Sequence, residues 1–317
     1  MISNEYIRLN RLIATTVFLV SFIVYYDTMA PTVSYWDCGE FIAVSHTLGV
    51  PHPPGSPFFL LLGRIASMLP ITEDIAFRVN LLSPISSAFA VMFLHLVIVL
   101  LVANWKGGIK NYQDSLVSFG GGVVGSLTFA FTDSHWFNAV EAEVYAFSTF
   151  FTAIVVWLIL KWNEKANEIG NERYILIIAY MIGLATGLHL LNLLAIPFIA
   201  LIIYFKRYDA NWYSFGYTVE ITGIVFFLIH NVIIKGMPKI ADSIGVWGAA
   251  CLVLSVFVFM IWAIKNQKLI LSLSLTSMVL ILIGYSTYAL IFIRSNQDPG
   301  IDENDPETIE AFISYLE

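Results

Sequence analysis

The chain has 317 residues, of which 58% are hydrophobic and only 12% are charged. Soluble domains carry about 25% charged residues, so this composition excludes a single water-soluble domain. The 16 Lys and Arg against 23 Asp and Glu give a formal net charge of -7, which argues against a nucleic-acid-binding protein. Two cysteines are too few for a disulfide scaffold. We therefore expect an all-α polytopic membrane protein.

Apolar runs long enough to cross a membrane recur along the chain. A span takes about 20 mostly apolar residues. The longer stretch 174–205 is interrupted by Gly183, Gly187 and Pro197, which predicts two short spans that meet at a polar turn near His189. Counting this pair, we expect about nine spans. The other apolar runs lie at 11–30, 82–103, 115–132, 143–162, 212–234, 243–264 and 269–293.

The distribution of basic residues predicts the orientation of these spans. Lys and Arg concentrate in cytoplasmic loops, and a cytoplasmic N-terminus places 11 of the 16 basic residues inside and 5 outside. The outside face then receives five segments. They are the long loop 31–80, the short loop 133–142, the turn at His189, the loop 235–242 and the C-terminal tail 295–317.

The composition changes once, at residues 295–317. This segment holds seven acidic residues and two prolines, which indicate an exit from the membrane. We therefore expect a membrane module at 1–294 and an acidic outside tail at 295–317, which would be the start of a further C-terminal region.

The first outside loop contains the densest group of unusual residues. Asp37 and Glu40 are three residues apart, so on a helical turn they share one face. Tyr35, Trp36 and Phe41 flank them, and a partly desolvated carboxylate can hold a proton near neutral pH. Asp37 and Glu40 are thus candidate catalytic acids. The alternative is a helix N-cap at Asp37 followed by a solvated Glu40.

A stiff segment follows at 51–57, where four of seven residues are prolines. Prolines at this density exclude a helix and fix an extended chain, which would present His52 to a substrate; a structural role for a lone His is the alternative. The apolar run 58–69, interrupted by Arg64, is too short to span and predicts a helix on the membrane surface. Arg78 then opens the second span.

Three motifs in this region resemble those of protein O-mannosyltransferases. They are Trp36–Phe41 (WDCGEF), His52–Gly55 (HPPG) and Phe77–Asn80 (FRVN). In that family the acids are adjacent and the later motif reads His-Pro-Pro-Leu, so the two residues between Asp37 and Glu40 are a departure. Ala139–Tyr145 (AVEAEVY) and the segment 293–306 are similar to a bacterial branch of longer membrane proteins, related to the vertebrate O-mannosyltransferase of plexin-type domains.

The resemblance implies a GT-C glycosyltransferase in the bacterial inner membrane, with its active site on the periplasmic face. A polyprenyl-phosphate-linked sugar, expected to be mannose, would be transferred with inversion to Ser or Thr of an exported protein. Asp37 would be the general base, and a positioned carboxylate contributes typically about 10²–10⁴-fold. Other readings stay open: a lipid-anchored saccharide as acceptor, a lipid transporter, or an assembly subunit without catalysis.

A second acidic pair, Glu141 and Glu143, lies in the outside loop after Asp133 and His135. Four oxygen or nitrogen ligands within eleven residues could hold a divalent cation. The pair resembles a metal-binding pair of oligosaccharyltransferases, whereas O-mannosyltransferases work without a bound metal. The alternative is that these carboxylates face water or orient the acceptor.

Three arginines are expected at the outer surface, at the depth of a lipid phosphate. Because Arg binds phosphate bidentately, Arg294 is the first candidate for donor binding, Arg78 the second and Arg64 the third. The alternative is snorkelling to ordinary lipid head groups. His189, at the interrupted span, is either a ligand-cavity residue or packs at a kink.

Overall fold

The computed structural model describes residues 4–317, which are mainly helical and contain no named β-strand. The predicted all-α polytopic fold is confirmed, since seven helical segments are long and apolar enough to cross a membrane. An eighth results if α6 (Tyr112–Ala130) and α7 (Asp133–Ala139), bent by 70°, form one span. The seven are Glu5–Thr28, Ile75–Trp105, Val144–Lys165, Leu190–Arg207, Trp212–Ile234, Gly236–Lys265 and Leu269–Ser295.

Within residues 4–317 the structure has one candidate span fewer than the nine expected, even when α6 and α7 are counted as one span. The remaining expected span corresponds to α9 (Glu172–Thr186), which has 15 residues and is shorter than the roughly 20 residues of a typical span. The interruption expected near His189 is confirmed: after α9 the chain turns, and a short 3-10 helix (Leu190–Leu194) leads into α10 (Ala195–Arg207). The expected loop 235–242 is instead helical, because Pro238 lies in the first turn of its helix, where a missing N–H is tolerated.

The described helices form two compact units. The first contains the residues up to His46 together with Leu62–Leu160, and the second contains Thr47–Leu61 together with Lys161–Glu317. The tail 295–317 is part of the second unit, so the units divide the chain elsewhere than at the change in composition. Packing between helices sets this division, and packing depends on which apolar faces meet.

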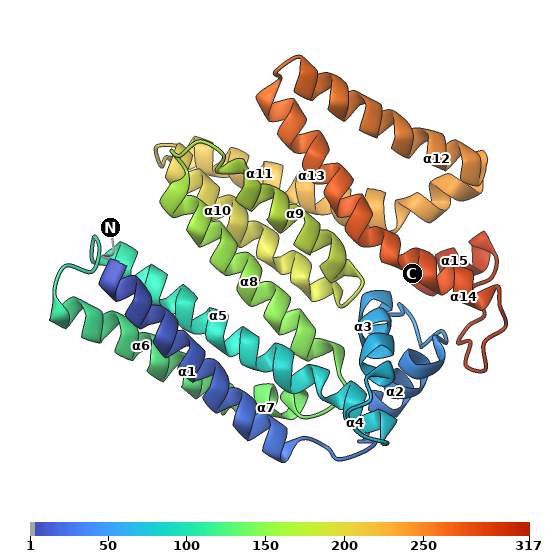
Figure 1. The fold of residues 1–317 in the computed structure, drawn as a ribbon. Coiled ribbons are helices and arrows are strands. Elements are labelled where there is room, and N and C mark those ends of the chain that lie inside the picture. The colour runs from blue at the N-terminus through green and yellow to red at the C-terminus, as the bar shows by residue number, and fades with distance from the viewer. Residues whose placement is uncertain (1–3) are drawn as a thin grey trace. The chain divides into compact units, whose positions relative to one another are not determined.

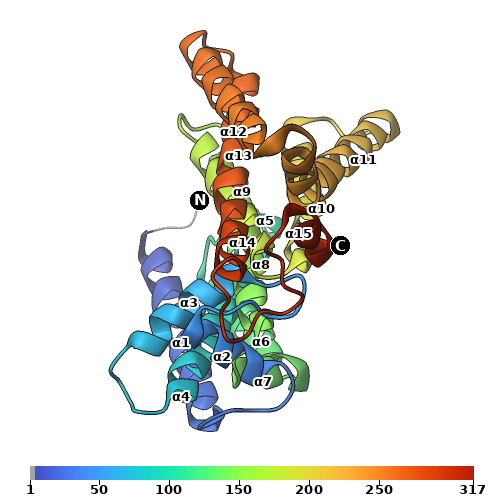
Figure 2. The ribbon, with the colours of Figure 1, turned by 90° about the vertical axis from the view of Figure 1, so that its right-hand side faces the viewer.

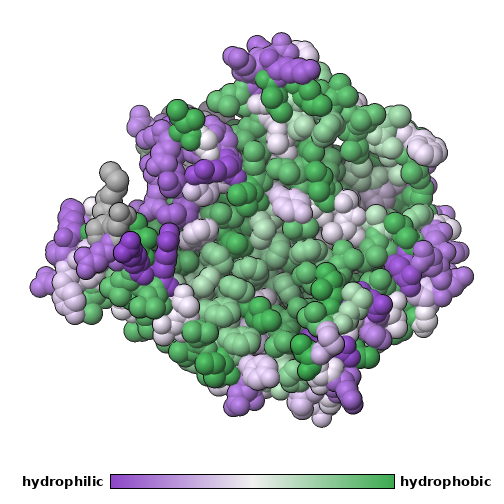
Figure 3. Space-filling view, viewed as in Figure 1, coloured by the Kyte–Doolittle hydropathy of each residue, from purple (hydrophilic) through white to green (hydrophobic). Residues whose placement is uncertain are grey.

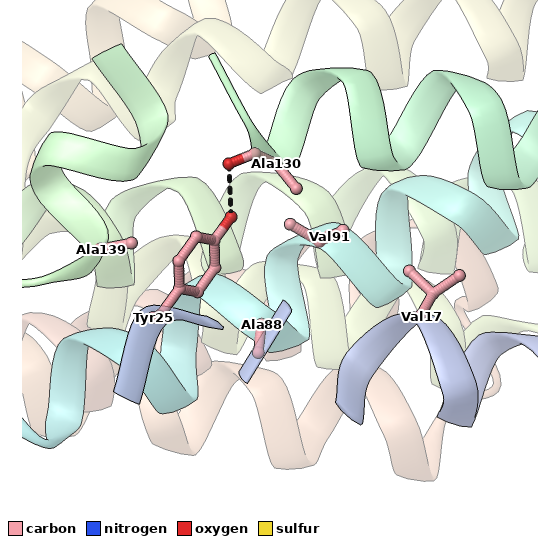
Figure 4. Close-up of a cluster of buried hydrophobic side chains, with 6 residues drawn as sticks. All are labelled: Val17, Tyr25, Ala88, Val91, Ala130 and Ala139. Carbon is pink, nitrogen blue, oxygen red and sulfur yellow. Dashed lines mark hydrogen bonds between the residues drawn. The ribbon is translucent and has the colours of Figure 1, made fainter. Parts of the chain in front are cut away.

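In the first unit, α1 (Asn4–Thr28) packs on α5 (Leu82–Trp105) and on α6 (Figure 1). Alanines contribute to their shared core, and such small side chains let the helix backbones approach closely. The hydroxyl of Tyr25 is fully buried there and donates to the carbonyl of Ala130 at 2.8 Å (Figure 4). The core residues are Val17, Tyr25, Ala88, Val91, Ala130 and Ala139.

Several connections meet where α1 ends. The amide of Ala30 donates to the carbonyl of Val140 at 2.8 Å. The side chain of Asn80 donates to the carbonyls of Ala30 and Thr32, each at 2.9 Å. These bonds bring the start of the first loop, the start of α5 and the α7–α8 connection to one end of the helix bundle.

The first loop contains short helices, as expected. They are α2 (Cys38–Thr47), α3 (Pro57–Met68) and α4 (Ile75–Asn80). The short helix predicted at 58–69 is therefore confirmed as α3, and its place on the membrane surface stays a prediction. Asp74 caps α4 with its carboxylate, which accepts the amide of Phe77 at 2.9 Å; this hydrogen bond lowers the pKa of Asp74.

In the second unit, α13 (Leu269–Tyr285) runs beside α9 in both views (Figures 1 and 2). Two glycines allow the helices to lie this close. A Cβ on Gly183 would lie 2.4 Å from the carbonyl oxygen of Ile281, and one on Gly284 would lie 2.4 Å from the backbone of Gly183. The remaining elements of the unit are α8 from Lys161 onward (Val144–Lys165 as a whole), α11 (Trp212–Phe227), a π-helical turn (Leu228–Ile234), α12 (Gly236–Lys265), a 3-10 turn (Ser286–Tyr288), α14 (Ala289–Ser295) and α15 (Ile309–Leu316).

The surface of these helices is largely apolar. Figure 3 shows hydrophobic residues over most of the face in view. Exposed large side chains such as Ile224, Leu254 and Ile270 lie on the candidate spans α11 to α13. Because a bilayer solvates apolar side chains, this surface is the one that membrane-spanning helices require.

Candidate functional site

Asp37 stands immediately before α2. Its carbonyl accepts the amide of Phe41 at 2.9 Å, so its backbone opens the helix, while its side chain is exposed. Trp36 precedes it with a φ of 59°, a left-handed conformation that bulky residues rarely adopt. Glu40 follows in the first turn of α2 and is half-buried. The sequence expectation that both acids lie on one helical turn is therefore met in the backbone.

Glu141 and Glu143 lie on the connection between α7 and α8, and both are buried, at 4% and 7% exposure. Buried carboxylates need hydrogen-bond donors, and local groups supply them. The hydroxyl of Ser34 donates to Glu141, and the amide of Val144 donates to Glu143 at 3.2 Å. The first outside loop thus supplies a donor to the second acidic pair.

Cys38 joins α2 to this pair. Its side chain is fully buried, and its Sγ donates to Oε1 of Glu143 at 3.9 Å. Burial, followed by the negative charges of Glu141 and Glu143, raises the pKa of the Cys38 thiol far above its usual range. The thiol is therefore protonated at neutral pH, which makes it a hydrogen-bond donor and not a nucleophile.

Glu143 has the most perturbed carboxyl group of this region. Its pKa is raised to about 7: burial is the largest cause, the negative charges of Asp37 and Glu141 act in the same direction, and the hydrogen bond from Val144 opposes them. Near neutral pH its carboxyl therefore exchanges a proton readily. Asp37, Glu141 and Glu143, which we call the carboxylate cluster, come from two loops that the sequence treated as separate sites.

Sequence reasoning missed the two residues that connect the loops. Ser34 lies outside the quoted motifs, Cys38 counted only as a residue between the two acids of WDCGEF, and their partners lie more than 100 positions away along the chain. His135, grouped with the second acidic pair by proximity in sequence, is buried beside the ring of Phe129, with ring centroids 4.3 Å apart. A role of Glu141 and Glu143 in holding a cation stays a prediction.

Arg64 and Arg78 both contact backbone carbonyls within the first unit. Arg64 donates to the carbonyl of His46, near the end of α2. Arg78 donates to Ser67 at 2.5 Å and to Leu69 at 3.2 Å, where α3 ends. Basic side chains commonly satisfy the last carbonyls of helices in this way. Binding of a lipid phosphate by either arginine stays a prediction.

The other three predicted residues lie in the second unit. His52 is half-buried on the proline-rich segment. Arg294, at the end of α14, donates to the carbonyls of Leu48 at 2.6 Å and Thr47 at 3.3 Å. His189 caps the 3-10 helix after α9, since its Nδ1 accepts the amide of Leu191 at 3.2 Å, and burial lowers its pKa. Their roles in binding substrate stay predictions.

The sequence of this chain is similar to that of known proteins over much of its length. A family model described as the protein O-mannosyl-transferase TMEM260 N-terminal domain matches residues 37–212. A protein O-mannosyl-transferase tmem260 of Dictyostelium discoideum is 31% identical over 210 residues, which are 62% of this chain and 24% of that relative. Protein O-mannosyl-transferase TMEM260 of Mus musculus is 29% identical over 149 residues, which are 47% of this chain and 19% of that relative.

The chain therefore spans about a quarter of the length of these relatives, or less. The matched region begins at Asp37 and contains both acidic pairs, so it includes the whole carboxylate cluster. The match covers parts of both units and includes the residues of the carboxylate cluster, which lie in the first unit. It follows that the chain belongs to the protein O-mannosyl-transferase TMEM260 N-terminal domain family.

Proposed function

We propose that this chain is the membrane-embedded part of a glycosyltransferase. It transfers mannose from a polyprenyl-phosphate donor to Ser or Thr of exported proteins, with inversion at the anomeric carbon. The relatives' name, protein O-mannosyl-transferase, supports the reaction type. The apolar helices support a lipid-linked donor, because such a donor is delivered in the plane of the membrane.

The observation that carries this proposal is an exposed carboxylate beside buried acids. Asp37 is exposed at the start of α2, whereas Glu141 and Glu143 are buried behind hydrogen bonds. A Ser or Thr hydroxyl is a weak nucleophile, and a carboxylate that accepts its proton during attack accelerates the transfer. Asp37 takes this proton, the oxygen bonds to the anomeric carbon, and the lipid phosphate leaves with the electron pair of the broken bond.

The departing phosphate needs positive charge. We propose Arg294 for this role, then Arg78 and Arg64, because the fork of N–H groups on Arg matches phosphate oxygens. Glu40 is the second candidate for the base, and His52 and His189 would contact the sugar or the acceptor.

The distribution of charge along the first unit supports the proposed orientation. Tyr6 and Ile13 of α1 pack on a cluster that includes Ile109, so the N-terminal part of α1 lies at the same end as Lys106 and Lys110. The carboxylate cluster lies at the other end, near Ala30 and Val140. Since basic residues favour the cytoplasm, the cluster faces the opposite side, which in a bacterial inner membrane is the periplasm.

A transfer assay with product analysis tests the proposal. Purified full chain in detergent receives polyprenyl-phosphate-mannose and a Ser/Thr peptide, and in parallel a lipid-anchored saccharide. We expect mannosyl peptide whose anomeric configuration, measured by NMR, is opposite to that of the donor. Transfer only to the saccharide would reassign the acceptor, and retained configuration would contradict direct displacement assisted by Asp37.

A further inference from the structure

The proline-rich segment of the second unit satisfies only part of its backbone by itself, as in the bond from the amide of Gly55 to the carbonyl of His52 at 3.0 Å. Residues 47–56 contain no regular helix after Thr47, and three of their peptide nitrogens belong to prolines and lack hydrogen. Backbone polar groups that leave water need partners elsewhere. Several of those partners come from the C-terminal segment of the chain.

The C-terminal segment 294–317 supplies these partners. The amide of Val50 donates to the carbonyl of Ile301 at 2.9 Å, and the amide of Glu303 donates to the carbonyl of Val50 at 3.1 Å. These two bonds form a parallel bridge between Val50 and Asp302. The bridge is tight: a Cβ added to Gly49 would lie 2.7 Å from the carbonyl oxygen of Ile301.

Tyr315 extends this contact to the peptide that carries His52. Its side chain is 1% exposed, and its hydroxyl donates to the carbonyl of Pro51 at 2.5 Å and approaches that of His52 at 3.4 Å. Gly55 closes the turn with a φ of 99°, and a Cβ there would lie 2.8 Å from the same hydroxyl. The turn after His52 is thus built against the tyrosine.

Further contacts hold both ends of the segment. Arg294 binds the carbonyls of Thr47 and Leu48, as described above. The hydroxyl of Ser56 donates to the carbonyl of Leu188 at 2.9 Å, and the amide of Phe58 donates to that of Gly187 at 2.9 Å. The segment is therefore fixed on both sides of His52.

We propose that the C-terminal segment 294–317 positions His52 for substrate binding, with Tyr315 as its main positioning residue; this inference rests on the transfer reaction proposed above. Catalytic and binding groups must be held within a fraction of an ångström by residues that are themselves locked in place. Tyr315 meets this requirement, because it is buried and bonded to the peptide on which His52 stands. Tyr315 itself contacts no substrate in this scheme.

The test compares two tyrosine variants of the full chain. Tyr315→Phe removes only the hydroxyl that binds Pro51. Tyr285→Phe is the matched control, since Tyr285 is also buried and donates to a backbone carbonyl, that of Ile234 at 2.8 Å. Both variants lose one buried hydrogen bond, so thermal unfolding is expected to change equally. Gly49→Ala is a second perturbation, which forces the bridge apart and leaves Tyr315 intact.

Two readouts separate positioning from stability. Hydrogen exchange of residues 48–56, followed by mass spectrometry, is expected to quicken about fivefold in Tyr315→Phe and not in Tyr285→Phe. Transfer by Tyr315→Phe is expected to fall by on the order of tenfold in kcat/KM, mainly through KM, because a misplaced binding group weakens substrate binding. Gly49→Ala is expected to change both readouts in the same direction.

Each possible result supports or overturns the positioning role of Tyr315. Unchanged exchange of residues 48–56 in Tyr315→Phe would overturn the positioning role, whatever the activity. Faster exchange with undiminished transfer would overturn its importance for the reaction. If the wild-type chain transfers no sugar, the proposed function fails, and exchange together with the rate at which diethyl pyrocarbonate modifies His52 still decides whether Tyr315 holds this residue.

Discussion

The buried carboxyl group of Glu143 predicts a pH-dependent stability that a single substitution removes. Its ordinary pKa of 4.5 is raised to about 7 in the folded protein, first by burial and then by Asp37 and Glu141. Between these pH values the folded chain keeps a proton on Glu143 that the unfolded chain has lost. Stability therefore falls as the pH rises from 4.5 and levels off above about 7.

The size of this effect follows from the two pKa values. One pKa unit corresponds to about 1.4 kcal/mol, so the rise from 4.5 to about 7 corresponds to about 3 kcal/mol of lost stability. In Glu143→Gln the side chain keeps its shape and bears no charge. Its single amide oxygen can still accept one of the two hydrogen bonds, that from Cys38 or that from Val144. The variant is expected to lose most of the pH dependence and to be more stable than wild type at pH 8.

Thermal unfolding in detergent, measured from pH 4.5 to 8.5 for both proteins, checks this expectation. A matched variant, Glu73→Gln, removes an exposed carboxylate of the same unit and is expected to leave the wild-type profile unchanged. If Glu143→Gln kept the wild-type slope, the assignment of a near-neutral proton to Glu143 would be wrong. Another carboxyl group of the cluster, that of Asp37 or Glu141, would then be the one protonated near neutral pH.

The structure makes two further predictions. Cys38 is buried and its thiol stays protonated, so in a Cys251→Ser background N-ethylmaleimide is expected to label it only after unfolding; labelling of the native protein at pH 8 would show that the cluster is open. Gly183→Ala places a methyl group 2.4 Å from the carbonyl oxygen of Ile281 and is expected to destabilise the α9–α13 pair by about 1–3 kcal/mol, whereas Gly223→Ala, with nothing within 4 Å, is not; equal melting temperatures would refute the close crossing.

Much of the fold could be predicted because membrane-spanning helices are recognised in a sequence by the length and apolarity of their residue runs. The spans at α1, α5 and α8 needed only runs of apolar residues. The interruption near His189 was predicted from Gly183, Gly187 and Pro197; Gly187 lies at the break, whereas Gly183 lies within α9 and Pro197 within α10. The helical start of α12 was missed, since Lys235 and Pro238 were taken as loop residues. Proline in a first turn is compatible with a helix, so composition alone misleads there.

The candidate site could be predicted in its residues but not in its assembly. Asp37, Glu40, Glu141 and Glu143 stood out in the sequence as acids within largely apolar stretches. Their meeting depends on tertiary contacts that have no local signature, such as the bond from Cys38 to Glu143 across 105 positions. The sequence also could not predict the partners of the arginines. These partners are backbone carbonyls, which every residue has, so no residue type marks them.

Transfer by the Asp37→Asn variant is the measurement that tests the central claim most directly. The assay uses polyprenyl-phosphate-mannose and a Ser/Thr peptide, with Asp27→Asn as control, since Asp27 is also an exposed aspartate of the first unit. If Asp37 is the base, its variant loses about 10²–10⁴-fold in rate, binds the donor normally, and Asp27→Asn keeps full activity. Equal transfer by wild type and Asp37→Asn would contradict the account and move the base to Glu40 or to the Glu141 and Glu143 pair.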